Sequence, residues 1–137
     1  MHVLTVLAYK DGDRVTSEFL ARSVNTNPVV IRRLLLALQQ ARLVETRKGA
    51  GFGSRLSRSA ARIDLSEVFR AVEQDEGFCL PKRKPDQACP VGHCIQSALG
   101  RVFSSARRAL EQDLAKTTLA DVLTVVRECC AGKADSD

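Results

Sequence analysis

Five cysteines in a chain of 137 residues are the side chains best suited to chemistry. Three of them, Cys79, Cys89 and Cys94, have nine and four residues between them, and His93 adjoins the third. Three thiolates could hold an iron–sulfur cluster if a fourth ligand came from His93 or from another chain. The same four side chains could instead bind zinc, although they lack the usual paired C-x-x-C spacing.

A thiol switch is a further possibility for these residues. Cys79 precedes the basic residues 82–84, and Cys94 lies near an expected helix start. Positive charge at both places favours the thiolate, which is the form that oxidants attack. Spacing alone does not separate a switch from a cluster, a zinc site or cysteines without a role, so all four interpretations stay open.

The remaining cysteines and the start of the chain bear on where the protein works. Cys129 and Cys130 are adjacent, so they cannot easily pair with each other. The odd total argues against a secreted disulfide framework. No run is long enough to span a membrane, and the apolar start MHVLTVLAY lacks the features of a signal peptide. We therefore expect a cytoplasmic protein without a membrane partner, and no enzyme, because no C-x-x-C motif adjoins a βαβ pattern.

Residues 26–41, TNPVVIRRLLLALQQA, predict the helix around which the chain is organised. Thr26 is a suitable N-cap, and Pro28 fits the first turn, where its missing N–H costs nothing. Apolar residues recur at helical spacing and predict one buried stripe, made of Ile31, Leu34, Leu35, Leu38 and Ala41. The paired Arg32 and Arg33 fall on another face.

A basic hairpin follows this helix. Residues 43–48 indicate a strand, residues 49–53 (GAGFG) a flexible tip, and residues 54–57 a returning strand. A helix with paired arginines and then a basic hairpin indicates a winged helix, in which the helix enters a major groove and the wing touches the duplex beside it. The net charge of +5 and the isoelectric point near 9.2 agree with a polyanionic partner.

The winged-helix interpretation assigns DNA-contacting roles to particular residues. Arg32 and Arg33 can donate paired hydrogen bonds to guanine, and Thr26 and Asn27 could hold a phosphate through backbone N–H groups at the helix start. Lys48 and Arg55 flank the wing tip and suit the phosphate backbone or minor groove. The full set of expected DNA-binding residues is Thr26, Asn27, Pro28, Val29, Arg32, Arg33, Lys48, Gly51 and Arg55.

The second half of the chain predicts an assembly element. From Pro90 the longest amphipathic pattern runs on at intervals of three and four, through Ile95, Leu99, Val102, Phe103, Ala106, Leu110 and Leu114. Thr118 with Asp121 resembles a capping box for a last helix. The long pattern could fold back on its own domain, but we favour packing against a second copy, because two-fold symmetry matches palindromic operators.

The expected fold is mainly α with a small β-hairpin, a winged helix-turn-helix domain plus a long dimerisation helix. The expected divisions are a DNA-binding domain over 1–75, a mobile Cys-containing loop over 76–89, dimerisation helices over 90–130 and a disordered tail over 131–137.

Three segments together carry a resemblance to one family: TNPVVIRRLL with LVETRKGAGFGSRL, then CPVGHCIQSAL, then TTLADVL. They resemble the Rrf2 (Rrf-two) family of bacterial winged-helix transcription regulators, particularly its YwnA-like branch, from His2 to about Arg127. Members usually begin several residues earlier, so Met1 is expected to fall inside the first helix. Phe52 and Ser54 stand where the family wing more often has Gly-Gly-Tyr.

The resemblance implies a homodimer that binds an operator, often as a repressor, with many members sensing iron–sulfur status, nitric oxide or thiol oxidants. Iron–sulfur members carry three closely spaced cysteines in the region of Cys79, Cys89 and Cys94, where the spacing in this chain is wider. The expected function is therefore DNA-binding regulation modulated by thiol oxidation or a cluster. The rival interpretations are a thiol- or metal-binding protein-interaction module that does not bind DNA, and a thiol oxidoreductase.

Overall fold

The computed structural model describes residues 1–49, 51–73 and 83–134. These residues form a mainly helical chain with one two-stranded antiparallel hairpin, as the sequence predicts. In chain order the elements are α1 (His2–Tyr9), α2 (Ser17–Val24), α3 (Pro28–Gln40), β1 (Val44–Arg47), β2 (Gly53–Leu56), the 3₁₀ helix η1 (Ala60–Arg62), α4 (Leu65–Val72), α5 (Pro90–Leu114) and α6 (Leu119–Ala134).

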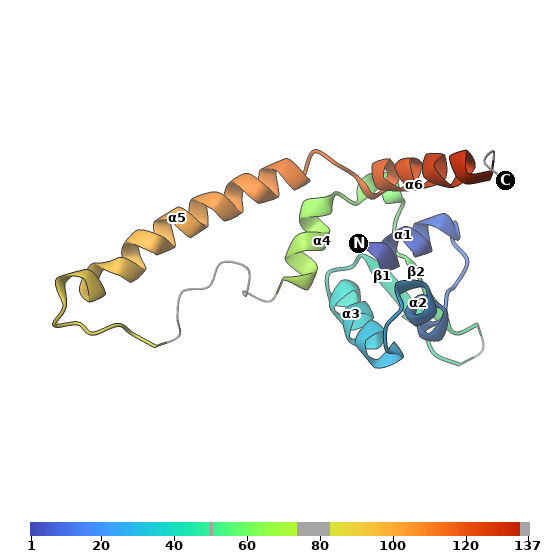
Figure 1. Cartoon of the computed structure of the whole chain (residues 1–137). Coiled ribbons are helices and arrows are strands. Elements are labelled where there is room, and N and C mark those ends of the chain that lie inside the picture. The colour runs from blue at the N-terminus through green and yellow to red at the C-terminus, as the bar shows by residue number, and fades with distance from the viewer. Residues whose placement is uncertain (50, 74–82, 135–137) are drawn as a thin grey trace.

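Helices α1 to α3 and the hairpin form the winged-helix unit (Figure 1). Helix α2 packs on α3, and α1 packs on both α2 and β2. The shared core is aliphatic, and its most deeply buried side chains include Leu4, Leu7, Leu20, Ile31, Leu38 and Leu43. Burial of these side chains stabilises the unit and holds the short hairpin, which could not fold alone, beside α3.

The hairpin is also tied to the turn before α2. Val15 and Ser54 exchange two backbone hydrogen bonds of 2.8 Å. Gly53 stands beside this bridge with a φ of +125°, and a Cβ there would lie 3.1 Å from Cβ of Arg14. Only glycine suits both that backbone conformation and that approach. The base of the wing is thereby fixed, and its tip projects from it.

Local capping explains where most helices begin. The Thr16 hydroxyl accepts from the N–H of Phe19, and the Asp64 carboxylate accepts from the N–H of Glu67. Thr118 and Asp121 form the predicted reciprocal capping box. The predicted cap of α3 is wrong by one residue.

Asn27, not Thr26, caps α3, with its side-chain oxygen accepting from the N–H of Val29 at 2.8 Å. Asn25 at the end of α2 adopts a left-handed conformation with φ 58°. This turns the chain so that the N–H of Thr26 bonds to the carbonyl of Ala21. Thr26 therefore completes the end of α2 and does not start α3.

Helix α5 extends away from the winged-helix unit, and α6 returns to it (Figure 1). The N–H of Leu119 bonds to the carbonyl of Ile63, and α6 packs on α1 with Leu119 and Leu123 buried. The expected division placed α6 with α5 in a separate unit, whereas α6 also completes the core of the winged-helix unit. The carboxyl end of α5 is thus the end that α6 holds near the winged-helix unit.

Helix α4 connects α5 to α3, because it packs against both. Two ion pairs join α4 or the residue after it to α5: Arg70 with Glu111 at 3.7 Å and Arg107 with Glu73 at 3.2 Å. A movement of α5 relative to the winged-helix unit would therefore act on the helix that supports α3.

The carboxyl end of the chain differs from expectation. Helix α6 continues to Ala134, so residues 131–134 are helical and do not belong to the predicted disordered tail. Residues 135–137 lie outside the described residues. Within residues 1–49, 51–73 and 83–134, no helix combines the length and the apolar character of a membrane span.

Candidate nucleic-acid interface

One face of α3 is exposed along the whole helix. At 100° per residue, six side chains lie within about 60° of the direction of Leu36. All six are exposed, and they are Val29, Arg32, Arg33, Leu36, Gln39 and Gln40. The buried Ile31, Leu35 and Leu38 hold the opposite side of the helix in the core. This face carries guanidinium, carboxamide and aliphatic groups and no carboxylate.

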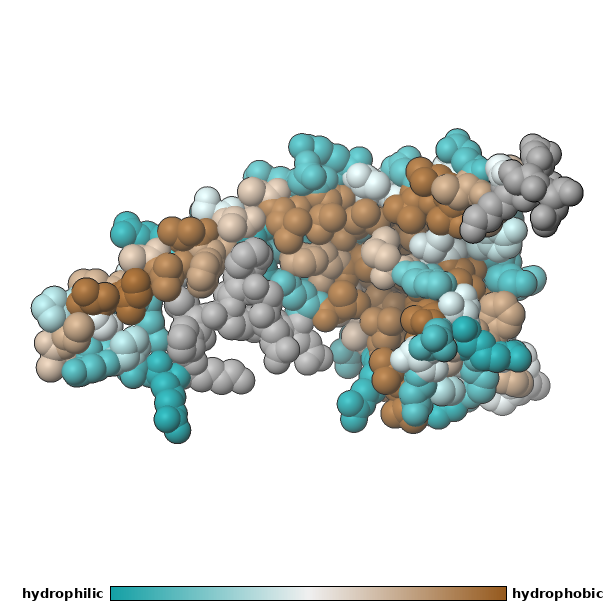
Figure 2. Space-filling view, viewed as in Figure 1, coloured by the Kyte–Doolittle hydropathy of each residue, from teal (hydrophilic) through white to brown (hydrophobic). Residues whose placement is uncertain are grey.

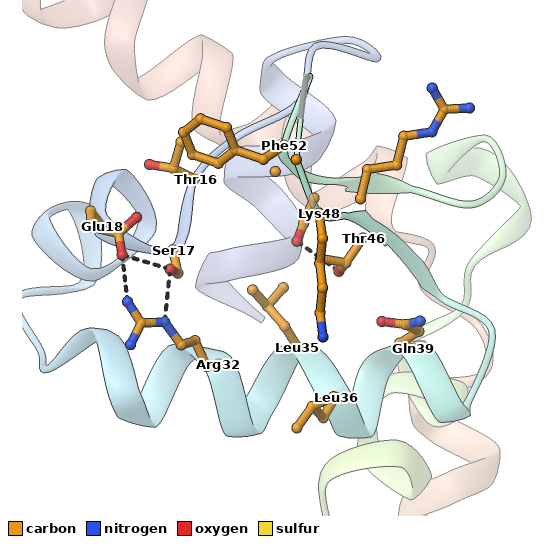
Figure 3. Close-up of a pocket in the computed structure, with 14 residues that line it drawn as sticks. Thr16, Ser17, Glu18, Arg32, Leu35, Leu36, Gln39, Thr46, Lys48 and Phe52 are labelled. Carbon is orange, nitrogen blue, oxygen red and sulfur yellow. Dashed lines mark hydrogen bonds and ion pairs between the residues drawn. The ribbon is translucent and has the colours of Figure 1, made fainter.

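A groove of about 790 Å³ separates this face from the hairpin and the start of α2. Figure 3 shows Leu36 and Gln39 on α3, with Lys48 extending toward them from the hairpin. The exposed ring of Phe52 lies on the other side, near Thr16. A helix beside a projecting hairpin is the geometry that places a helix in a major groove and a wing beside it.

The charge of the chain is concentrated in these elements. Residues 19–63 contain nine arginines or lysines and one carboxylate, Glu45. The other residues contain 12 basic and 15 acidic side chains, since the whole chain has 21 and 16. The modest net charge of +5 thus conceals a strongly basic region and a slightly acidic remainder. Such a region attracts a polyanion to α3 and the wing.

Glu45 is engaged within the hairpin. Its carboxylate pairs with Arg55 on the facing strand and with Arg14 at 2.8 Å. The hydrogen bond from Arg55, together with the charges of both guanidinium groups, holds the pKa of Glu45 below its usual value. Arg55 is therefore less available to a phosphate than its position in the sequence suggests. Lys48 is exposed and takes no part in the ion pairs found among the described residues.

The two arginines of α3 differ in their surroundings. The guanidinium of Arg32 bonds to Glu18 of α2 at 2.6 Å and to the hydroxyl of Ser17 at 3.3 Å (Figure 3). Hydrogen bonds from the backbone N–H of Glu18, from Arg32 and from Ser17 hold the pKa of Glu18 below its usual value. The pair therefore persists at neutral pH. Arg33 is exposed and makes no ion pair with any described residue.

Replacing Glu18 with glutamine is expected to strengthen binding to duplex DNA by about two- to fivefold at low salt. The change removes a carboxylate from the edge of the groove and leaves Arg32 with a neutral partner, so more positive charge faces the phosphates. Fluorescence anisotropy over a series of salt concentrations measures the effect, with Glu128→Gln on α6 as the control. Equal affinity of the Glu18 variant and the parent would show that this edge does not meet DNA.

The start of α3 and the wing tip hold the other expected residues. Asn27 and Val29 are exposed, Thr26 and Pro28 are half-buried, and the N–H groups of Thr26 and Val29 are already bonded. The expectation that Thr26 offers a free N–H to a phosphate is therefore wrong. Gly51 lies at the exposed wing tip with a φ of +73°, which favours glycine.

The cysteine region begins at the far end of α5. Cys89 precedes the first turn, Cys94 lies in the second turn, and both thiols are exposed, as is His93. Among residues 83–134 and the other described ranges, no three His, Cys, Asp or Glu side chains gather as a metal would require. The cluster or zinc site expected from Cys79, Cys89, His93 and Cys94 stays a prediction. Cys79 lies outside the described residues.

Three features of the site were missed by sequence reasoning. Leu36 is exposed, and the signal was present, because three successive leucines cannot all face one buried side of a helix. Phe52 was noted only as a departure from the family wing. The bond between Glu18 and Arg32 joins residues 14 positions apart and depends on how α2 packs on α3.

Residues 1–125 match the Rrf2 family, described as an iron-dependent transcriptional regulator. The chain is 40% identical over 123 residues to YwnA of Bacillus subtilis (strain 168), named as an HTH-type transcriptional regulator, and 90% of each chain is covered. A crystal structure described as that of a DNA-binding protein is also 40% identical, with a TM-score of 0.69 over 89% of this chain and 93% of that one. IscR of T. potens is 22% identical and shares the fold, with a TM-score of 0.67 over 93% of this chain and 82% of its own. The chain therefore belongs to the Rrf2 (Rrf-two) family of transcriptional regulators.

Proposed function

We propose that the chain acts as a homodimer that binds operator DNA through α3 and the wing and represses transcription from the promoter it occupies. The observation that carries the proposal is the concentration of nine basic side chains against one carboxylate in residues 19–63, which include a helix face and a hairpin on two sides of one groove. A neutral groove of this shape would equally suit a protein partner. The charge favours nucleic acid.

The surface of α5 supports the dimer. No side chain of its apolar stripe is buried: Val102 is 60% exposed, Ala106 and Leu110 are also exposed, and the other four are half-buried. The hydrophobic surface follows the helix in Figure 2. Helix α5 has 25 residues and projects from its own domain, and the exposure of this apolar stripe to water is unfavourable in free energy. Packing against a second α5 removes the stripe from solvent and sets two winged-helix units on one duplex.

The test uses a palindromic duplex selected by the purified protein from a random-sequence pool. Fluorescence anisotropy against that duplex and a shuffled one, from 50 to about 300 mM salt, gives specific affinity and the salt slope. We expect sedimentation to give a dimer, the selected duplex to bind at least about 1,000-fold more tightly than the shuffled one, and both affinities to fall with salt. Absence of any selected sequence contradicts the proposal.

Cysteine chemistry modulates this binding in the proposed function. Cys89 and Cys94 expose their thiols at the end of α5 farthest from the winged-helix unit of the same chain (Figure 1). A peroxide converts a thiolate to a sulfenic acid and releases hydroxide, and a second thiol then forms a disulfide and releases water. In a dimer such a change would shift one α5 against the other, and α4 would pass the movement to α3.

Peroxide is therefore expected to weaken operator binding by at least about fivefold, and a reducing thiol is expected to restore it. Operator affinity before and after treatment, with mass spectrometry of the modified cysteines, measures the effect. Cys89→Ser and Cys94→Ser test the two described thiols, and Cys129→Ser on the exposed end of α6 is the control. Identical binding curves before and after oxidation would rule out thiol control.

A further inference from the structure

Exposed aliphatic side chains on α3 are not explained by the charge of the interface. Leu36 is 61% exposed, and Val29 and Val30 are 52% and 54% exposed. Phosphate contacts need cations and hydrogen-bond donors, and they make no use of a leucine. Leu36 and Val29 point in nearly the same direction from α3, so the exposed face holds aliphatic surface along one line among its arginines and glutamines.

The position of Leu36 restricts what that partner can be. Leu36 lies between Arg32 and Gln40 on the exposed face of α3, and it also lines the groove opposite Lys48. Arg32 and Arg33 lie about one turn before Leu36, Lys48 lies across the groove from it, and the one carboxylate that lines the groove, Glu18, is already paired with Arg32. An apolar protein surface would also have to bury the charges of Arg33 and Lys48, which make no ion pair with a described residue, and that burial is unfavourable. A partner that is polyanionic overall and apolar at one point fits this surface better.

Duplex DNA has one such group in the major groove, the C5-methyl of thymine. We propose that Leu36 is a specificity-determining residue that contacts a thymine methyl in each half-site of the operator. Val29 is within about 20° of the same helical direction, so it lies on the same line of α3, about 10 Å from Leu36 toward the start of the helix. Val30 points about 120° from Leu36 and faces away from that line. The inference rests on the proposed binding of DNA by α3.

The experiment removes the methyl group and nothing else. Each thymine of the selected palindrome is replaced in turn by deoxyuridine, in both half-sites, and the affinity of the parent protein is measured by anisotropy. One thymine position is expected to lower affinity by about 15-fold when both half-sites are changed, since burial of one methyl in each gives about fourfold. Leu36→Ala is expected to bind the thymine and deoxyuridine duplexes at that position equally.

Val30→Ala is the matched control. It truncates an exposed aliphatic side chain of the same helix that does not lie on the line through Val29 and Leu36. It is expected to keep the full difference between thymine and deoxyuridine. If the parent binds every deoxyuridine duplex as tightly as the thymine duplex, the inference is wrong while DNA binding stands. If Leu36→Ala keeps the difference, another side chain contacts the methyl. If no palindrome can be selected, the proposed function fails first, so the two failures are distinguishable.

Discussion

Replacing Val102 with aspartate is expected to give monomers and to weaken operator binding by about 100-fold or more. Val102 lies in the middle of the uncovered stripe of α5 and touches little within its own chain, so the monomer is expected to stay folded. In a two-fold dimer the substitution places two unpaired carboxylates in an apolar contact, at a cost of about 3–5 kcal/mol each. A lone winged-helix unit then loses the high effective concentration that the second unit provides at its half-site.

Sedimentation and anisotropy against the selected palindrome measure both effects, and circular dichroism checks the fold. Ser104→Asp is the matched control, since it adds the same charge two residues away, about 200° around the helix. It is expected to leave both mass and affinity unchanged. A Val102→Asp protein that remains a dimer and binds as the parent does would show that α5 is not the contact between copies.

How far the fold could be predicted depended on the range of the interactions involved. The caps at Thr16, Asp64 and Thr118 each join residues three positions apart, so a short stretch of sequence contains both partners. The wing was predicted from the glycines at positions 49, 51 and 53 between two short β patterns. All three glycines have a positive φ in the structure. These local signals agree with one another, and the helix of residues 26–41 followed by a hairpin was predicted in the right order.

The site depended on longer-range packing and was predicted less well. The sequence predicted Thr26 as the cap of α3, but Asn27 is the cap, because the N–H of Thr26 bonds to the carbonyl of Ala21 at the end of α2. Leu119 belongs to the winged-helix core through contacts with residues more than 50 positions earlier in the chain, and no local sequence pattern predicts such contacts. Arg32 and Arg33 look equivalent in sequence, and only the packing of α2 on α3 separates them.

Because of that separation, replacing Arg33 with alanine is expected to weaken operator binding more than replacing Arg32. The sequence alone assigned both arginines to DNA contact and did not rank them. Arg33 holds a guanidinium free of intrachain ion pairs among the described residues, whereas Arg32 must share or leave Glu18 before it can meet DNA. A bidentate arginine contact to guanine contributes about 1–3 kcal/mol of discrimination, so Arg33→Ala is expected to cost at least about tenfold. Arg32→Ala is expected to cost about two- to threefold, because part of its interaction with DNA replaces an existing ion pair.

Anisotropy at a fixed salt concentration, against the selected palindrome and a shuffled duplex, separates the two roles. Loss confined to the palindrome marks contact with a base edge, and an equal loss on both duplexes marks contact with phosphate. Arg108→Ala on α5 is the control, because Arg108 is exposed and far from α3. Arg107 is unsuitable, because its ion pair with Glu73 joins α5 to the end of α4. Equal small losses for Arg32, Arg33 and Arg108 would mean that α3 does not enter the groove. A larger loss for Arg32 than for Arg33 would mean that Glu18 releases its partner on binding and that the intrachain pair does not limit recognition.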